Sequence, residues 1–157
     1  MPDWIEILTR LGAAALVGGG IGLNRHLHHK STGIRTLSLV ACGAAGLVIA
    51  TLHAGGGGVH VDAMSRVIQG IMTGVGFIGA GVIFRNQADD KIHGLTTAAA
   101  VWITAAMGAL CGIGEWKIIV ALSVIVAIVL LTGGPIERWC DTALGNKPKR
   151  AAIDRPD

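Results

Sequence analysis

Long apolar stretches separated by short breaks constrain this chain more than any other feature of its sequence. Crossing a bilayer takes roughly 20 mainly apolar residues. Stretches that approach this length lie at residues 4–23, 36–53, 67–84, 95–111 and 116–132. With 52% hydrophobic and only 15% charged residues, the chain has too little polar surface to cover a soluble core. The sequence therefore predicts an all-α integral membrane protein with five transmembrane helices.

Short glycine-rich breaks divide these stretches. The sequence AGGGG at 54–58 interrupts the chain between the second and third stretches. The sequence GIGEW at 112–116 predicts a tight turn between the fourth and fifth. We expect one five-helix transmembrane domain over residues 1–135, followed by a short basic cytoplasmic tail over residues 136–157.

Lysine and arginine are distributed unevenly among the predicted loops. Cytoplasmic loops of membrane proteins carry an excess of these residues. With five crossings, ten of the 13 basic residues fall on one side: Arg25, Lys30, Arg35, Arg85, Lys91, Arg138, Lys147, Lys149, Arg150 and Arg155. We therefore expect the N-terminus outside and the C-terminus in the cytoplasm. The net charge of +3 then reflects topology, and we expect the lipid bilayer as a partner but no nucleic acid.

Glycine recurs at helical spacing in the third stretch. Hydrocarbon provides no hydrophobic drive for helix association, so close packing of small residues replaces it. Gly70, Gly74 and Gly81 share one side of this predicted helix, and Gly76 and Gly79 lie on a second side. Because a helix with two small faces can contact neighbours on both, we place the third helix at the centre of the bundle.

The first predicted helix repeats this pattern, with Ala14, Gly18 and Gly22 at four-residue steps. We interpret the glycines of both helices as helix-packing residues. A sliding or rocking surface used in gating is the alternative that the sequence leaves open.

Acidic and basic residues pair at four-residue spacing near the predicted outer side. Glu6 precedes Arg10, and Asp62 precedes Arg66, which is the favourable order for an ion pair along a helix. One interpretation is that both pairs set the register of the helices. The other is a polar cavity open to the outside that holds a cation, a proton or water, with Gln69 one turn below Arg66. Both interpretations predict that the two arginines face the interior of the bundle, where charged groups in membranes usually pair.

The two halves of the chain resemble each other. EILTR at 6–10 parallels DAMSR at 62–66, and GGGIGLNR at 18–25 parallels GAGVIFR at 79–85. We interpret this as a parallel duplication of a helical hairpin, to which a fifth helix is added.

Histidines and carboxylates offer little for metal binding. The sequence HLHH at 26–29 would suit a transition metal, whereas Mg²⁺ prefers oxygen ligands. His60 and Asp62 provide a single carboxylate. Because no nucleophile has a plausible base in the same layer, we expect no enzyme and no bound cofactor, and we keep Mg²⁺ as an open alternative.

Four segments of the sequence resemble a known family. RLGAAALVGGGIGLNR, TGIRTLSLVACGAA, RVIQGIMTGVGFIGAGVIFR and HGLTTAAAVW are similar, in this order, to the MgtC/SapB family of bacterial inner-membrane proteins. The resemblance covers about residues 6–115. It implies a five-helix fold in the bacterial plasma membrane and a link to magnesium limitation. The motif residues on the cytoplasmic side are Asn24, Arg25, Arg35, Thr36, Arg85, Gly94, Thr96 and Thr97.

Two positions depart from the family pattern. Family members commonly have Glu-Arg where this chain has Asn24-Arg25, and Arg or Lys where His93 stands. Both changes weaken the hypothesis that the cytoplasmic side holds a cation site. The longer members also carry a soluble C-terminal domain, whereas this chain ends about 25 residues after the fifth stretch.

Two classes of function follow from these features. The resemblance implies a non-enzymatic regulator of partner membrane proteins, linked to magnesium homeostasis or to acid and low-magnesium stress. The alternative is a transporter or channel for Mg²⁺ or another cation. A conduit should offer uncompensated carboxylates, whereas each outer acid here has an arginine nearby, which favours the regulator. The predicted helices have more small faces than five helices need for packing within one bundle. We therefore also expect a homodimer.

Overall fold

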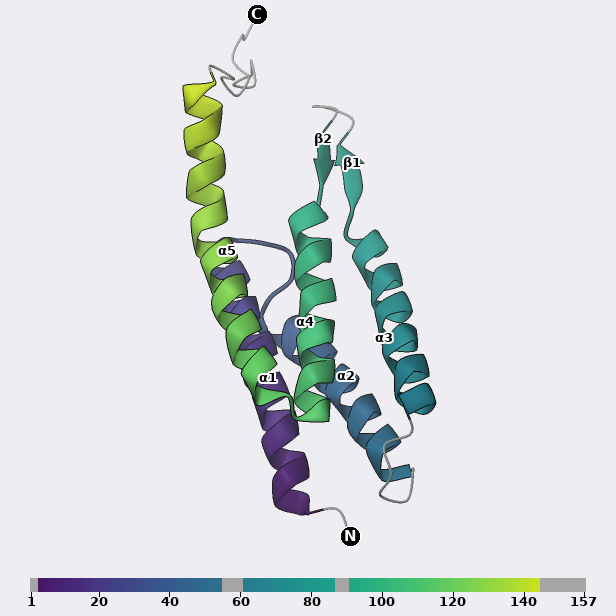
Figure 1. The fold of residues 1–157 in the computed structure, drawn as a ribbon. Coiled ribbons are helices and arrows are strands. Elements are labelled where there is room, and N and C mark those ends of the chain that lie inside the picture. Colours follow the sequence, from purple (N-terminus) through teal and green to yellow (C-terminus); the bar gives the residue numbers. More distant parts are fainter. Residues whose placement is uncertain (1–2, 55–60, 87–90, 145–157) are drawn as a thin grey trace, which may run out of the picture. The chain divides into compact units, whose positions relative to one another are not determined.

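The described part of the chain is almost entirely helical. The computed structural model describes residues 3–54, 61–86 and 91–144. Five helices occur within these ranges: α1 (Trp4–Leu27), α2 (Ile34–Ala54), α3 (Val61–Gly81), α4 (Leu95–Ile113) and α5 (Trp116–Ala143) (Figure 1). The predicted all-α fold is confirmed. By length and composition, α1, α2, α4 and residues 116–136 of α5 could each cross a membrane.

Helix α3 has 21 residues, but it is not among the helices that are long and apolar enough to cross a membrane. It begins at Val61, six residues before the predicted start at Val67. The earlier start brings Asp62 and Arg66 into the helix. Hydropathy marked the beginning of the apolar segment, but backbone hydrogen bonds form a helix without requiring apolar side chains.

A short hairpin joins α3 to α4, where the sequence predicted a loop. Strands β1 (Phe84–Asn86) and β2 (Lys91–His93) pair antiparallel, with Arg85 opposite Ile92. Gly94 follows at φ +91°, and a Cβ there would lie 1.9 Å from the Val82 carbonyl oxygen. Only glycine fits this close approach, so Gly94 sets the angle at which the chain enters α4.

The chain divides into two compact units, Met1–Ser123 and Val124–Asp157. The second unit contains the rest of α5, which continues past the predicted end at Thr132 and through Pro135 to Ala143. A proline inside a helix removes one backbone hydrogen bond and bends the helix. The first unit contains the other helices and the first two turns of α5.

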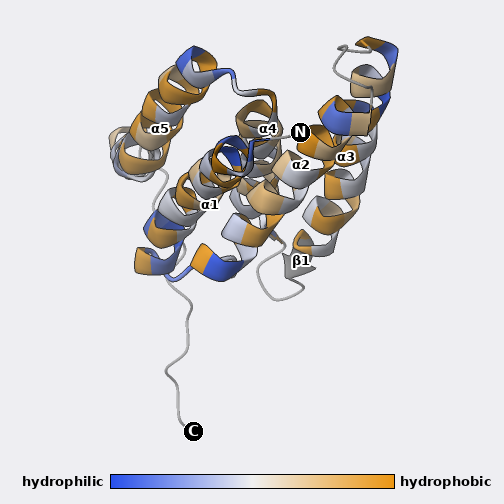
Figure 2. Ribbon diagram, turned by 90° about the horizontal axis from the view of Figure 1, so that it is seen from below, coloured by the Kyte–Doolittle hydropathy of each residue, from blue (hydrophilic) through white to orange (hydrophobic). Residues whose placement is uncertain are grey.

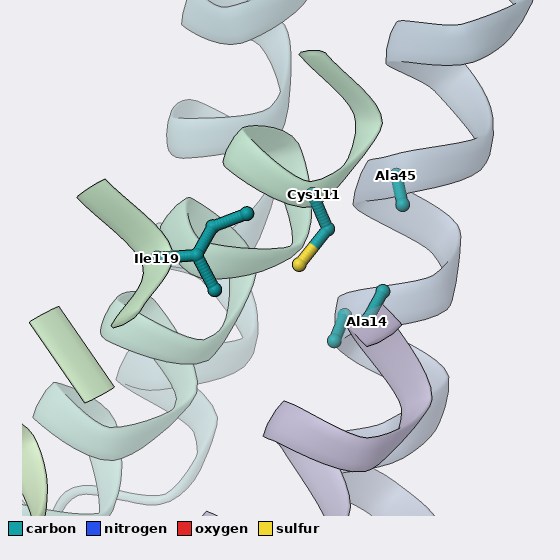
Figure 3. Close-up of a cluster of buried hydrophobic side chains, with 5 residues drawn as sticks. Ala14, Ala45, Cys111 and Ile119 are labelled. Atoms are coloured by element: carbon teal, nitrogen blue, oxygen red, sulfur yellow. The ribbon is translucent and has the colours of Figure 1, made fainter. Parts of the chain in front are cut away.

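Small residues form the core of the first unit. Ala14 of α1, Ala41 and Ala45 of α2, Cys111 of α4 and Ile119 of α5 form one buried cluster. Figure 3 shows Cys111 between Ile119 on one side and Ala14 and Ala45 on the other. Because three of the five members are alanines, the helix backbones approach closely, as lipid-embedded helices require.

Helix α4, rather than α3, occupies the centre of the first unit. Ten residues of α4 are buried, compared with three of α3. Figure 2 shows α2 and α4 between α1 and α3. The prediction that α3 is central was wrong, because glycine spacing shows which faces are small but not which of them meet a neighbour.

Large apolar side chains also cover the outside of these helices. Leu16 is 79% exposed and Leu39 is 73% exposed, and Figure 2 shows apolar residues on outward as well as inward faces. A helix that is apolar on all sides is buried in a protein or in lipid. These faces, together with the four apolar helices, identify a membrane protein.

Candidate functional site

Two arginines of α1 are largely buried, one near each end of the helix. Arg10 and Arg25 are 15 positions apart, or roughly 22 Å along a helix. Each guanidinium contacts α4, whose two ends lie near opposite ends of α1 (Figure 1). Buried charges in a membrane are costly and mark functional or structural sites, so these two contacts form the candidate site.

Arg10 joins the first helix to the end of the fourth. Its Nη1 donates a hydrogen bond to the Gly112 carbonyl oxygen at 2.6 Å, and its Nη2 pairs with Glu6 Oε1. The Arg10 side chain is 19% exposed and that of Glu6 is 57% exposed. The predicted ion pair therefore forms, and Arg10 faces the bundle as predicted. Within the described residues, the buried Nε of Arg10 has no hydrogen-bond partner.

The end of α4 is shaped to receive this guanidinium. The last four carbonyls of a helix lack partners within the helix, and Gly112 provides one of them. The chain then turns at Gly114, at φ +92°, where the Gly114 amide donates to the Leu110 carbonyl at 2.9 Å. A Cβ on Gly114 would lie 3.1 Å from Arg10 Nη2. Glycine at this position thus permits both the tight turn and the contact, and the cation meets the negative end of the α4 dipole.

Arg25 joins three segments on the other side of the unit. Its side chain is 3% exposed. Its Nε donates to Thr32 Oγ1 at 2.9 Å, its Nη1 to the Thr96 carbonyl oxygen at 3.3 Å, and its Nη2 to Thr97 Oγ1. These partners lie in the α1–α2 loop and the first turn of α4. Arg25 has no carboxylate partner among the described residues, and its partners there are hydroxyl and carbonyl oxygens.

Sequence reasoning assigned Arg25, Thr96 and Thr97 to one motif, and the structure brings these three together. It missed Thr32, which no pattern in the STG sequence distinguished. Within the described part of the chain, no other motif residue hydrogen-bonds to Arg25. Arg35 and Thr36 are exposed, and Asn24 is half-buried. Arg85 lies in β1, and its side chain lies outside the described part.

The polar residues of α3 do not join this site. Asp62, Arg66 and Gln69 are exposed, and the buried side of α3 instead carries Ile71, Val75 and Gly79. Among the described residues, Asp62 and Arg66 form no ion pair. The expectation that Arg66 faces the interior of the bundle does not hold in this chain. Helices α2 and α4 separate α3 from α1 (Figure 2), so Asp62 and Arg66 lie apart from Glu6 and Arg10.

The predicted packing glycines fall into two groups. A Cβ on Gly18 would lie 2.5 Å from the Leu37 carbonyl oxygen, and one on Gly22 would lie 2.6 Å from Ile34 Cα, so α1 and α2 touch along this row. A Cβ on Gly79 would lie 3.5 Å from the Cβ of Ala98. The second group meets nothing within 4 Å and comprises Gly70, Gly74, Gly76 and Gly81.

Among the described residues, sequence reasoning missed the closest approach between two helices of this unit. A Cβ on Gly108 would lie 2.3 Å from the Ala41 carbonyl oxygen, and one on Gly112 would lie 2.8 Å from that of Ala45. The two glycines are four residues apart on α4, which is the same signal that identified Gly18 and Gly22. Across the described ranges, no group of three or more His, Cys, Asp or Glu side chains is arranged to hold a metal ion.

Comparisons with known proteins give a consistent result. Protein SrpB of Synechococcus elongatus is 44% identical over 124 residues, which are 74% of this chain and 68% of SrpB. Protein MgtC of Salmonella typhimurium is 37% identical over 119 residues, which are 76% of this chain and 48% of MgtC. Escherichia coli YhiD, whose full name is "Putative magnesium transporter YhiD", is 38% identical over 130 residues.

These relatives differ from the chain in length. The chain spans about two thirds of SrpB, 59% of YhiD and about half of MgtC. No solved structure matches the chain with significance. The MgtC family model, however, matches residues 11–139, a range that includes α2, α3, α4 and most of α1 and α5. By this match and these relatives, the chain belongs to the MgtC family.

Proposed function

We propose that this protein is a non-enzymatic inner-membrane protein that acts in magnesium homeostasis or in adaptation to acid and low-magnesium stress. In this proposal its N-terminus lies outside and its C-terminus in the cytoplasm. It acts by binding partner membrane proteins through helix–helix contacts and regulating them. The link to magnesium is supported by membership of the MgtC family and by the name of YhiD.

The observation that carries the proposal is the Arg10 contact. An outer carboxylate that binds a passing cation must be free to exchange partners. Glu6 is instead paired with Arg10, whose guanidinium is held on the Gly112 carbonyl oxygen at 2.6 Å. A cation that approached Glu6 would meet this fixed positive charge, which opposes its binding. The contact supports a role in holding helices together over a role in conduction.

The open side of α3 supports partner binding. A Cβ added at Gly70, Gly74 or Gly81 would meet nothing within 4 Å. Such small residues allow the backbone of another helix to approach closely in lipid, where dispersion contacts replace the hydrophobic drive. A partner helix packed on this face would require no rearrangement of the buried core.

A cation transporter is the second candidate, and the name of YhiD favours it. Measuring divalent-cation flux into proteoliposomes that contain a magnesium-sensitive dye distinguishes a transporter from a regulator. We expect no saturable Mg²⁺ flux from folded protein at any pH or membrane potential. Saturable flux in the wild type that is lost in Glu6→Gln would establish the transporter instead. Glu115→Gln provides the matched control, because Glu115 is also an exposed outer acid but has no arginine partner in the described part of the chain.

The regulatory role is tested in a host that lacks its own family member. Gly74→Leu adds bulk on the open side of α3, where an added Cβ would meet nothing within 4 Å. We expect it to reduce complementation of growth in low magnesium or at acid pH. Gly43→Leu on α2 is the matched control, because its Cβ position is equally open. Full complementation by both variants would overturn the proposed use of this face.

A further inference from the structure

The outward side of α3 carries a regular row of polar and small residues. The row has alternating spacings of four and three positions, and every member is exposed: Asp62, Arg66, Gln69, Thr73, Gly76 and Ala80. We call this row the α3 seam. It lies opposite the side of α3 that is buried on the rest of the unit, which carries Ile71, Val75 and Gly79. Thus the most polar side of α3 points away from its own bundle.

This arrangement is unfavourable for a helix that faces lipid. With 21 residues, α3 is roughly 31 Å long, close to the thickness of the hydrocarbon core. Gln69 lies about 12 Å along it. Among the described residues, the side chains of Asp62, Arg66 and Gln69 make no ion pair or hydrogen bond. Because ionisable and amide groups in membranes usually turn toward protein, the α3 seam favours a protein partner over lipid.

We propose that the partner is a second copy of this chain, which packs its own α3 seam against the first in a parallel two-fold dimer. Spacings of four and three keep a row of residues facing a neighbouring helix in a left-handed crossing. Two copies inserted with the same topology place their α3 helices parallel. At this two-fold axis each seam residue faces its own copy at the same level, so Asp62 of one copy and Arg66 of the other lie diagonally, one turn apart.

The α3 seam is complementary to itself along its whole length. The two Asp62 and two Arg66 side chains together are neutral, and each acid can pair diagonally with the base of the other copy, which gives two equivalent ion pairs. The Gln69 amide both donates and accepts hydrogen bonds, so it pairs with its own copy. Gly76 and Ala80 then let the two backbones approach closely toward the other end. The charge complementarity within one short row is the reason that a second copy fits better than an unrelated helix.

This inference goes beyond the proposed function and does not depend on it. Gly70, Gly74 and Gly81 lie to one side of the α3 seam, about 100° around the helix from its centre. A dimer through the seam therefore leaves that face open for another protein. Failure of the dimer would not affect the complementation test at Gly74, and failure of complementation would not affect the dimer.

Disulfide cross-linking in native membranes tests the geometry. The background carries Cys42→Ala, Cys111→Ala and Cys140→Ala, which removes all three native thiols. Gly76→Cys places a thiol on the α3 seam, and Gly74→Cys places one on the side face two residues away. Neither added Cβ meets anything within 4 Å in the chain. A disulfide needs Cα atoms within about 7 Å, so the two variants report different faces at nearly the same depth.

We expect mild oxidation to give several-fold more covalent dimer from Gly76→Cys than from Gly74→Cys. Equal yields, a higher yield from Gly74→Cys, or no dimer from helical, membrane-inserted protein would each overturn the proposal. Circular dichroism of the purified background protein verifies that it is folded.

Charge exchange tests the pairing between copies. In the Gly76→Cys background, Asp62→Arg gives two bases on the seam, and Arg66→Asp gives two acids. Each variant expressed alone should lose most of its cross-linking. Co-expressed with different tags, the two variants should form a mixed dimer at the wild-type level, because each base then faces an acid of the other copy.

This result separates pairing between chains from pairing within one helix. If Asp62 and Arg66 paired only along their own α3, mixing would change nothing, since each variant helix still carries two like charges. Cross-linking that does not respond to either substitution, or mixing that restores nothing, would overturn the proposal.

Discussion

Arg10 donates a hydrogen bond from Nη1 to the Gly112 carbonyl oxygen at 2.6 Å, across 102 positions of sequence. This contact connects the beginning of α1 to the last turn of α4. It gives a partner to one of the carbonyls that the end of α4 leaves free. The same guanidinium pairs with Glu6, so one side chain stabilises both a helix end and a carboxylate.

Removal of this side chain should destabilise the first unit. We expect Arg10→Ala to lower the free energy of unfolding by about 1–3 kcal/mol, because a hydrogen bond from a charged donor to a part-buried carbonyl is lost. Thermal unfolding in detergent, followed by circular dichroism, measures the change. Glu6→Gln is the control and should cost less than about 1 kcal/mol, since Glu6 is 57% exposed. An equal or larger loss in Glu6→Gln would contradict this account.

A single added methyl group at Gly108 should separate α4 from α2. Its Cβ would lie 2.3 Å from the Ala41 carbonyl oxygen, and this backbone atom cannot move alone. We expect Gly108→Ala to lower the free energy of unfolding by about 1–3 kcal/mol through overpacking. Gly43→Ala, at an open position of α2, should be neutral or stabilising, because alanine favours helix over glycine by about 1 kcal/mol. Equal melting temperatures for the two variants would rule out the close approach.

Arg25 should not tolerate replacement by lysine. The guanidinium reaches Thr32, Thr96 and Thr97 at once from three nitrogen atoms, whereas an ammonium is a single point charge. We expect Arg25→Lys to lower the free energy of unfolding by about 1–3 kcal/mol, the cost of leaving buried polar groups without partners. The same exchange at exposed Arg35 should change it by less than about 0.5 kcal/mol. Indistinguishable denaturant midpoints for the two lysine variants would refute the three-way contact.

The entry to α4 should depend on glycine at position 94. The backbone there has φ +91°, and a Cβ would lie 1.9 Å from the Val82 carbonyl oxygen. We expect Gly94→Ala to cost about 1–3 kcal/mol of stability through backbone strain and this overlap. Gly81→Ala, at the open end of α3, is the control. Hydrogen exchange at the first turn of α4 localises the effect, and unchanged protection there would count against it.

Much of the helical organisation could be predicted from the sequence. The five helices, the turn at Gly114 and the packing role of Gly18 and Gly22 follow from apolar length, glycine position and small-residue spacing. The Glu6–Arg10 pair also forms as its spacing predicts. The hairpin before Gly94 was not predicted, because three-residue strands carry almost no periodic signal.

The sequence by itself determined which segments are helical and which of their faces are small or charged, since these properties depend on neighbouring residues. Tertiary structure alone decided that α4 is central, that Arg10 meets the Gly112 carbonyl, and that Asp62 and Arg66 point away from the bundle. In a soluble protein an apolar stripe shows which side of a helix is buried. Here the helices are apolar on nearly every side, so hydropathy cannot distinguish a face that meets lipid from one that meets protein. That choice depends on close backbone approaches between residues far apart in the chain, such as Gly108 and Ala41.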